Sequence, residues 1–463
     1  MPAIRNVTLC FVCFFISSLS VPVFAQTRTL RIVEYNIEAD VNTYTGPLPG
    51  LIAPPTATNN VSAGGVLEGI GEETIGPDRG QPIDVLALEE TTSNPSTVTP
   101  IVNGLNTVYG VPGMYASSSY QAKTSGGTGG GPNAMVYNTL TVQLLASTPV
   151  DPAGGSGQLG GSKSGELREV VRYEFAPAGV APASSNEFYV YVSHYKASPG
   201  AANEAERLAE AQIIRTNEAD DLPATARVLY VGDYNVDDSG EAGYQTILAA
   251  TSPNGITQGQ GIDPLNLTNN TGIDWSSSTT DTNILLMLTE HSYNLEYRDD
   301  LQVMTTNIYS GAPGGLKYVP GTYHAFGNNG SISYSGSVNS GINTALSNSR
   351  LVTNGPVFLN ALQIYLDLTD ASDHLPLVVD YTIPIPAPAM SSFSLSGTNL
   401  ALSVTNGITN AVYSVLMQTN LATPLTNWVV LTTNTFATGN FTFTATNAVN
   451  AAAPTQFFLL KGK

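Results

Sequence analysis

Five apolar segments of this chain each end or begin at a polar residue of a type that binds metal or phosphate. A short apolar run is typical of a buried strand, and a polar residue at its end lies at the edge of the sheet. The five segments are Arg31–Asn36, Asp84–Glu90, Tyr189–His194, Val228–Asn235 and Ser372–Val379. Together they predict a sheet-based fold whose strand ends build one oxygen-rich site.

Helical patterns lie between these strands. Asn203 and Glu206 have the spacing of a capping box, which predicts the start of a helix after the third segment. Its expected apolar face consists of Ala205, Leu208, Ala209, Ile213 and Ile214. A second, shorter helix is expected from near Ser239, with Tyr244, Ile247 and Leu248 on its apolar face. The order strand, helix, strand favours α/β packing over an all-β barrel.

The chain divides into four predicted parts. Residues 1–25 have the charged start, the short apolar run and the small terminal residues of a signal peptide. Residues 27–383 carry the five segments and are expected to form a catalytic domain. Residues 384–389 form a proline-rich linker, and residues 390–463 follow as a small accessory domain. We therefore expect a secreted protein, extracellular or periplasmic, without a stable membrane span and as a monomer.

The accessory domain is expected to be a small β-sandwich, because six short alternating runs follow one another at spacings of about ten residues. No histidine and no carboxylate side chain occurs after Asp380. Such a domain is suited to binding a surface or a polymer rather than to catalysis. Both cysteines, Cys10 and Cys13, lie in the predicted signal peptide, so no disulfide or thiolate site is expected.

The charge balance constrains the partners. Without the predicted signal peptide the chain has 16 basic and 36 acidic side chains, a balance of −20. Such a protein repels nucleic acid and anionic membranes at long range. A divalent cation in the site can invert the local field, so a polyanionic substrate stays possible.

Strand alternation predicts which side each polar residue faces. His194 shares a face with Phe188, Val190 and Val192, Asp233 with Leu229 and Val231, and Glu90 with Leu86 and Leu88. A single aspartate or histidine at such a place is usually a cap or a hydrogen-bonded core residue. Several in this order favour one site.

The motifs resemble those of the endonuclease/exonuclease/phosphatase superfamily, the group of deoxyribonuclease I-like proteins. The matching pieces lie within residues 30–381 in the order of that family. They are Val33-Glu-Tyr-Asn36, Leu88-Glu-Glu90, Val192-Ser-His194, Gly232-Asp-Tyr-Asn235, Arg298-Asp-Asp300 and Ser372-Asp-His-Leu-Pro376. The resemblance implies an α/β fold, a four-layer sandwich of two packed mixed β-sheets flanked by helices.

The resemblance also implies roles for these residues. Asn36, Glu90 and Asp373 would surround a divalent metal, and such hard oxygen ligands suit Mg²⁺ best, with Mn²⁺ or Ca²⁺ as alternatives. Asp233 and Asn235 would act on the attacking water and on a phosphoryl oxygen. His374, oriented by Asp300, would be the base or the charge stabiliser. His194 would hydrogen-bond the phosphate.

Some positions depart from the family pattern or are left open by it. Glu89 stands where the family usually has glutamine, and we expect it on the opposite face in a structural role. No acidic partner for His194 is found in the segment before Tyr137. Arg168 and Lys196 are candidate phosphate contacts, although Arg168 has an alternative as a surface ion pair. His291 and His324 are expected to be solvated loop residues outside the site.

The sequence thus predicts a secreted, divalent-metal-dependent phosphoesterase that hydrolyses phosphodiesters, with nucleic acid as the favoured substrate. Two alternatives remain open. One is a phosphodiesterase acting on phospholipid or sphingomyelin head groups, followed by one acting on small phosphate esters. The other is a non-catalytic surface-binding protein that keeps the fold.

Overall fold

The computed structural model describes most of the chain. The described residues are 26–40, 49–52, 65–74, 80–122, 130–150, 168–266, 274–276, 279–290, 294–347, 360–385, 389–405, 407, 412–436, 440–450, 453 and 455–462. The predicted signal peptide lies outside this set, as do His291 and residues 386–388 of the predicted linker. No helix within the described residues is both long and apolar enough to cross a bilayer.

Two mixed β-sheets form the larger part of the molecule. The strands of the first sheet are β1 (Gln26–Asn36), β2 (Ile83–Glu89), β3 (Tyr115–Ser117), β4 (Ala134–Asn138), β11 (Lys317–Tyr318), β12 (His324–Ala325) and β13 (Leu377–Ile385). Their order is β11-β13-β1-β2-β4-β3, and β12 also pairs with β13. Only β1 and β2 run parallel; β1 pairs with β13, and β2 with β4, in antiparallel fashion.

The second sheet has the order β5-β6-β7-β8-β10-β9. Its strands are β5 (Val142–Val150), β6 (Val170–Pro177), β7 (Phe188–His194), β8 (Val228–Asp233), β9 (Gly261–Ile262) and β10 (Asp300–Thr305). Strands β7 and β8 are parallel, and β10 pairs with β8 antiparallel. The end of β7, the end of β8 and the start of β10 therefore lie at one edge of the sheet.

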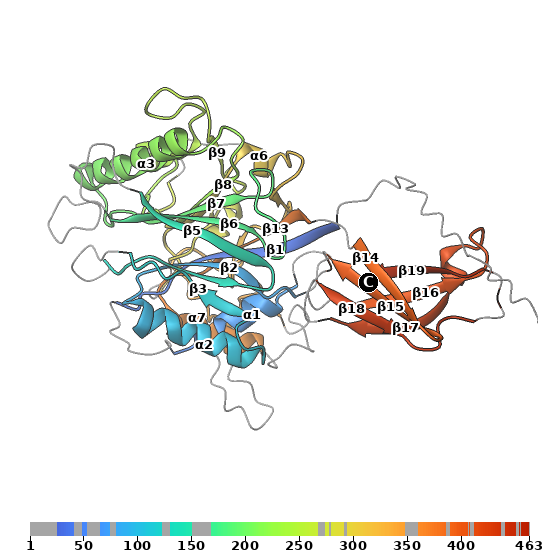
Figure 1. The fold of residues 1–463 in the computed structure, drawn as a ribbon. Coiled ribbons are helices and arrows are strands. Elements are labelled where there is room, and N and C mark those ends of the chain that lie inside the picture. Colours follow the sequence, from blue (N-terminus) through green and yellow to red (C-terminus); the bar gives the residue numbers. More distant parts are fainter. Residues whose placement is uncertain are drawn as a thin grey trace, which may run out of the picture.

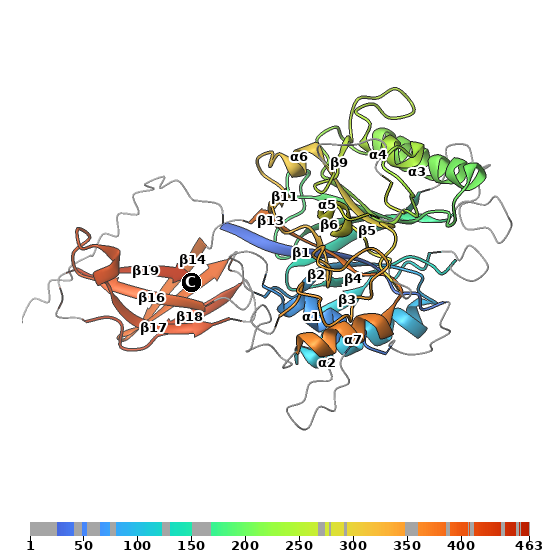
Figure 2. The same ribbon diagram turned by 180° about the vertical axis from the view of Figure 1, so that it is seen from behind.

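Helices cover the outer faces of both sheets (Figures 1 and 2). Helices α1 (Val66–Glu72), α2 (Thr99–Val108) and α7 (Ala361–Ala371) lie against the first sheet, and α3 (Ala201–Asp221) and α4 (Ala242–Leu248) against the second. The remaining short helices of this part are η1 (Asn94–Val98), α5 (Thr282–Leu285) and α6 (Thr306–Tyr309). The predicted α/β fold of four layers is confirmed.

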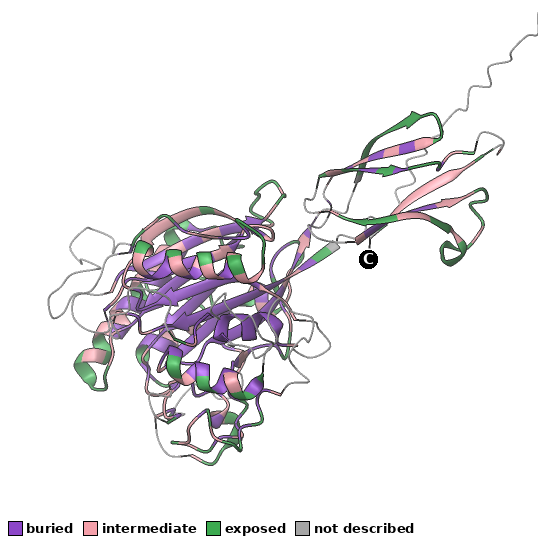
Figure 3. Ribbon diagram, turned by 90° about the horizontal axis from the view of Figure 1, so that it is seen from below, coloured by how far each residue is buried: buried purple, intermediate pink, exposed green. Residues whose placement is uncertain are grey.

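The main core lies between the two sheets and appears as the buried centre of Figure 3. Phe188, Val190 and Val192 belong to it, together with Leu229 and Val231. The intervening Tyr189 and Tyr191 belong to a second core under α3. The alternation predicted for β7 and β8 is therefore confirmed, and it directs the end of each strand toward the space between the sheets.

Helix α3 corrects two expectations. It begins after Gly200, so Asn203 lies inside the first turn, where its amide donates to Pro199 O, and the capping box is not formed. Its buried face is rich in charge rather than apolar. The buried residues are Arg207, Glu210, Ala211, Ile214, Arg215, Glu218 and Ala219. Ion pairs stabilise this face, for example Arg207 with Glu241 of the α4 N-cap at 2.5 Å; α4 itself begins at Ala242, close to the expected start.

The C-terminal part contains two antiparallel three-stranded sheets with a core of their own. One sheet has the order β14-β15-β18 and the other β17-β16-β19. Their elements are β14 (Ala389–Ser396), β15 (Asn399–Thr405), β16 (Val412–Gln418), η2 (Leu425–Asn427), β17 (Val429–Thr435), β18 (Phe441–Ala445) and β19 (Phe457–Gly462). Pro384 and Ile385, which were expected in the linker, are the last residues of β13.

Candidate functional site

The ends of four strands meet where the two sheets face one another. Asn36 ends β1, His194 ends β7 and Asp233 ends β8. His194 and Asp233 are register partners in the parallel pair, and Asp300 is the antiparallel partner of Asp233. Because β10 runs against β8, the first residue of β10 reaches the same edge as the last residue of β8.

Glu90 reaches the site by a different route. Strand β2 ends at Glu89, and Glu90 follows with a positive φ of 52°. This left-handed conformation is uncommon for a residue with a side chain, and such residues cluster at functional sites. The simple alternation expected for Leu86, Leu88 and Glu90 therefore stops at Glu90, and the backbone turn directs its carboxylate toward β7 and β8.

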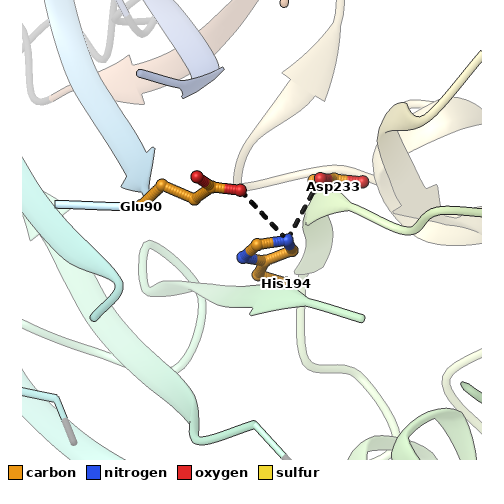
Figure 4. Close-up of side chains that lie close together, drawn as sticks. All are labelled: Glu90, His194 and Asp233. Atoms are coloured by element: carbon orange, nitrogen blue, oxygen red, sulfur yellow. Dashed lines mark ion pairs between the residues drawn. The ribbon is translucent and has the colours of Figure 1, made fainter. Parts of the chain in front are cut away.

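Glu90, His194 and Asp233 form a compact buried group (Figure 4). The His194 Nε2 lies 3.2 Å from Asp233 Oδ2 and 3.6 Å from Glu90 Oε1. One atom from each of the three residues lies within 4.8 Å of the others, which is close enough for all three to hold one metal ion. The sequence analysis found no acidic partner for His194. In the structure Asp233 and Glu90 are its acidic neighbours.

Asn36 links the two carboxylates of this group. Its Nδ2 donates to Glu90 Oε1 and to Asp233 Oδ2, each at 3.1 Å, while its Oδ1 accepts from the backbone N–H of Glu38. The Ser372 hydroxyl donates to Asn36 O at 2.7 Å and accepts from His374 N at 3.1 Å. Ser372 belongs to the Ser-Asp-His motif, but the sequence predicted no role for it. In the structure its hydroxyl connects the end of β1 to the segment that carries His374.

His374 is held by a carboxylate on each side. Its Nδ1 lies 2.8 Å from Asp300 Oδ2, and its Nε2 lies 3.9 Å from Asp233 Oδ2 and 3.7 Å from Asp373 Oδ1. Burial by itself lowers the pKa of His374, but the charges of Asp300, Asp373 and Asp233 outweigh it and raise this pKa well above its ordinary value. His374 is therefore cationic at neutral pH.

The two histidines differ in protonation. Burial, with the nearby charge of Arg168, lowers the pKa of His194 to about 4, against the opposing effect of Asp233. The Nδ1 of His194 is buried and has no hydrogen-bond partner among the described residues. His194 is therefore neutral at pH 7. Burial would raise the pKa of Asp233, but the two imidazoles lower it well below its ordinary value, so Asp233 is ionised between them.

Asn235 positions Asp233 directly. Its backbone N–H and its Nδ2 both donate to Asp233 Oδ1, at 3.0 and 2.7 Å, and Nδ2 also reaches Tyr195 O at 3.2 Å. Asn235 has a φ of 48°, which bends the chain back toward the carboxylate at the end of β8. The other oxygen of Asp233 is left for Asn36 and the imidazoles.

Arg168 and Lys196 lie on the α3 side of the site. Both backbone N–H groups donate to the carboxylate of Glu210 on α3, at 3.1 and 3.2 Å. The Arg168 guanidinium donates to Tyr195 O at 2.5 Å, and the Lys196 ammonium to Ala197 O at 3.4 Å. Arg168 is close enough to lower the pKa of His194, so it lies near the group rather than on a remote surface.

Glu89 departs from its expected place. It is the parallel register partner of Asn36 on β1, so both side chains lie on the same side of the first sheet. Its carboxyl group contacts that of Glu34, and both are fully buried. Burial raises the pKa of each well above its ordinary value, and Asp300 and Asp233 add to this effect. Glu89 and Glu34 therefore form an acid pair beneath the site.

Two further acidic residues near His374 were not predicted. Glu290 forms an isolated bridge with His374, and its carboxyl group lies beside that of Asp299. Burial raises the pKa of Glu290 to about 7, and the charge of His374 acts in the opposite direction. Asp299 stands next to the predicted Asp300, but nothing in the sequence marks Glu290, because its approach depends on a loop between α5 and β10.

His324 lies away from this group, as expected, but it is not a solvated loop residue. It begins β12, and its Nε2 lies 2.8 Å from Glu73 Oε2 while its Nδ1 lies 2.9 Å from Thr322 O. Both ring nitrogens face an acceptor, and only the protonated imidazole carries a hydrogen on each nitrogen. Burial lowers the pKa of His324, but the charge of Glu73 outweighs burial and raises this pKa above its ordinary value.

Comparison with known proteins returns solved structures only. No protein-family model matches the chain, and no curated protein matches it. Among the solved structures, an endonuclease/exonuclease/phosphatase from Beutenbergia cavernae is similar, with 13% identity, 94% of this chain and 95% of that chain covered, and a TM-score of 0.37. The human Nocturnin catalytic domain with bound sulfate shows 14% identity, coverage of 77% and 96%, and a TM-score of 0.39.

A third similar structure is D. rerio TDP2 complexed with a single-strand DNA product, with 12% identity, coverage of 76% and 98%, and a TM-score of 0.36. The first of the three is described by the name of the superfamily that the sequence motifs resemble.

The residues present fit a divalent metal ion. Glu90 Oε2 is a buried oxygen that accepts no hydrogen bond from the described residues, and Glu90, His194 and Asp233 already lie within range of one ion. Such a donor set, mainly carboxylate oxygen, suits Mg²⁺, Mn²⁺ or Ca²⁺. Asn36, which the resemblance places at the metal, here turns its amide nitrogen toward the carboxylates.

Proposed function

We propose that the protein is a divalent-metal-dependent phosphodiesterase of the nuclease type, active outside the cytoplasm. The observation that carries this proposal is the position of Asp233 Oδ2, which lies 3.2 Å from His194 Nε2 and 3.9 Å from His374 Nε2, with Glu90 Oε1 3.6 Å from His194 Nε2. An anion that can accept a proton and a cation that can stabilise developing charge are what hydrolysis of a phosphodiester requires.

Each side chain then has a role. Asp233, held by Asn235 and Asn36, would orient the attacking water and take its proton. His374, kept cationic by Asp300, would stabilise the charge that develops on phosphorus-bound oxygen, and it is too fully protonated to act first as a base. His194 would donate a hydrogen bond to the phosphate. Glu90 and Asp373 would hold the metal, which when bound polarises a phosphoryl oxygen. Asn36, predicted as a third ligand, would instead hold the carboxylates of Glu90 and Asp233 in place through its amide nitrogen.

Nucleic acid is the substrate that we favour. The side chains of Arg168 and Lys196 would contact the phosphates of its backbone. One observation favours a small phosphodiester as the second candidate. Four arginines among the described residues are committed to buried ion pairs, namely Arg31 with Asp380, Arg207 with Glu241, Arg215 with Glu218 and Arg298 with Asp263. A protein with this charge balance offers few cations along an extended polyanion.

The test is hydrolysis of plasmid DNA and of bis(p-nitrophenyl) phosphate, each with Mg²⁺, with Mn²⁺ and with EDTA. His374→Ala is compared with His324→Gln, which changes a histidine outside the site, after circular dichroism has shown that both variants are folded. We expect metal-dependent cleavage of both substrates by the wild type and by His324→Gln. His374→Ala should lose at least about 100-fold in rate, the usual contribution of a positioned group that stabilises the charge of the transition state.

The outcomes separate the candidates. Cleavage of the small diester alone would support the second candidate and exclude nucleic acid as the substrate. Cleavage that EDTA does not stop, or that His374→Ala retains, would contradict the proposed chemistry. A folded wild-type protein that cleaves neither substrate would support the alternative of a non-catalytic binding protein.

A further inference from the structure

Asp40 stands beside Glu90 with an oxygen that no donor reaches. Asp40 Oδ1 and Glu90 Oε2 are both buried, and neither accepts a hydrogen bond from the described residues. The two carboxyl groups lie within hydrogen-bonding reach of one another. Two ionised carboxylates are acceptors only, so they cannot satisfy each other without something positive between them.

The backbone holds Asp40 firmly in this place. Its own N–H donates to Glu90 O at 3.1 Å, and Gly130 N donates to Asp40 Oδ2 at 3.1 Å. A Cβ added at Gly131 would lie 2.4 Å from Thr91 O and 3.0 Å from the Asp40 carboxyl carbon. The segments after β1, after β2 and before β4 are therefore packed together around one carboxylate, which has its second oxygen turned toward Glu90.

The two carboxylate oxygens of Glu90 have different surroundings. Its Oε1 accepts from Asn36 and lies 3.6 Å from His194 Nε2, while its Oε2 is the oxygen without a partner. Glu90 itself is only 7% exposed, so water does not compensate for the missing donor. Carboxylate oxygens are among the ligands that hard divalent cations prefer.

We propose that Asp40 is a ligand of the divalent cation, binding through Oδ1 together with Glu90 Oε2. The proposal rests on the metal-dependent function proposed above and adds a ligand to its site. The segment Asn36-Ile-Glu-Ala-Asp40 then supplies a ligand directly after the end of β1. The predicted ligand set of Asn36, Glu90 and Asp373 did not include it.

The test is the binding of Mn²⁺ to the metal-free full chain. Binding is measured by isothermal titration calorimetry and by the electron paramagnetic resonance signal of the Mn²⁺ that stays free. Asp40→Asn is compared with Asp370→Asn, which makes the same change at an exposed position of α7. Asparagine keeps the shape and can still accept from Gly130 N, so the fold should persist, which circular dichroism checks. We expect Asp40→Asn to weaken Mn²⁺ binding about tenfold or more, and Asp370→Asn to leave it within twofold.

Equal Mn²⁺ affinity of Asp40→Asn and wild type would overturn the proposal, because the two carboxyl groups would then share a proton instead of a cation. A wild-type protein that binds no Mn²⁺ would overturn it as well. Hydrolysis by the wild type is measured in parallel. Weakened Mn²⁺ binding in Asp40→Asn without any wild-type hydrolysis would support Asp40 as a ligand and contradict the phosphodiesterase function.

Discussion

At the scale of single residues, the surroundings of each histidine decide its charge. His194 and His374 lie on either side of Asp233, yet only His374 has a carboxylate bound to its Nδ1. His194 has a buried Nδ1 with no described partner. Burial therefore dominates at His194 and keeps it neutral, while the flanking charges dominate at His374 and keep it cationic.

This difference predicts a shift in the pH dependence of hydrolysis. Asp300 raises the pKa of His374, so the wild type should lose activity only at alkaline pH, where His374 gives up its proton. In Asp300→Asn the cation loses its partner, and the alkaline limb of kcat/KM for bis(p-nitrophenyl) phosphate should move to lower pH by about one unit or more. Asp370→Asn serves as the matched control. An unmoved limb would show that His374 is not the group that titrates.

His324 predicts a pH-dependent contribution to stability. Because its folded pKa is raised, its stabilising effect is complete below the unfolded pKa of about 6.5 and is lost as the pH rises through the folded pKa. His324→Gln should therefore lower the free energy of unfolding by about 2 kcal/mol at pH 6, as for a hydrogen bond to a charged group, and by less at pH 9. Urea unfolding at both pH values measures this. A loss that does not change with pH would contradict the ion pair with Glu73.

At the scale of elements, the parallel pairing of β7 with β8 positions the site, and it depends on one glycine. Gly232 has a φ of 137°, and a Cβ there would lie 1.7 Å from Ser193 O on β7. Ser193 is followed by His194 on β7, and Gly232 is followed by Asp233 on β8. If the two strands separate at Ser193 and Gly232, the two site residues therefore move apart.

Gly232→Ala should therefore lose about 3 kcal/mol or more of stability, or fail to fold, because both the contact and the backbone conformation exclude a side chain. Gly179→Ala is the control: its φ is also positive, at 77°, but no atom lies within 4 Å of the added Cβ. We expect that variant to lose about 1 kcal/mol. Urea unfolding compares the two, and similar losses would contradict a special role of the contact with Ser193.

At the scale of the whole molecule, the two parts of the chain have separate cores and opposite charge. The C-terminal sheets pack around Leu402, Tyr413, Val415 and Phe443. Beyond Asp380 the only charged side chains are Lys461 and Lys463, so all 36 acidic groups belong to the part that carries the site.

Removal of residues 389–463 should leave the hydrolysis of bis(p-nitrophenyl) phosphate within twofold of the full chain, because every candidate site residue lies before β14. Calorimetry of the full chain should show two unfolding transitions, of which the truncated protein keeps one. A single transition for the full chain, or lost activity in a truncated protein that is still folded, would contradict the independence of the two parts.

The sequence determined the α/β class and the positions of five strand segments along the chain, because apolar periodicity is local and is read directly from neighbouring residues. The four-layer arrangement was expected only from the resemblance of the motifs to a known family. It also marked Asn36, Glu90, His194, Asp233 and His374 as strand-end residues. It failed at α3, where ion pairs with distant residues such as Glu241 allow charged side chains into the core.

Only the tertiary structure decided which side chains meet. Glu90 enters the site through a left-handed turn that strand alternation does not predict, and Glu89 lies on the same side of the sheet as Asn36 because of the β1–β2 register. The charge of each imidazole follows from burial and from carboxylates supplied by other strands. The approach of Asp40 to Glu90 likewise depends on three segments that are far apart in the chain, and no local pattern contains that contact.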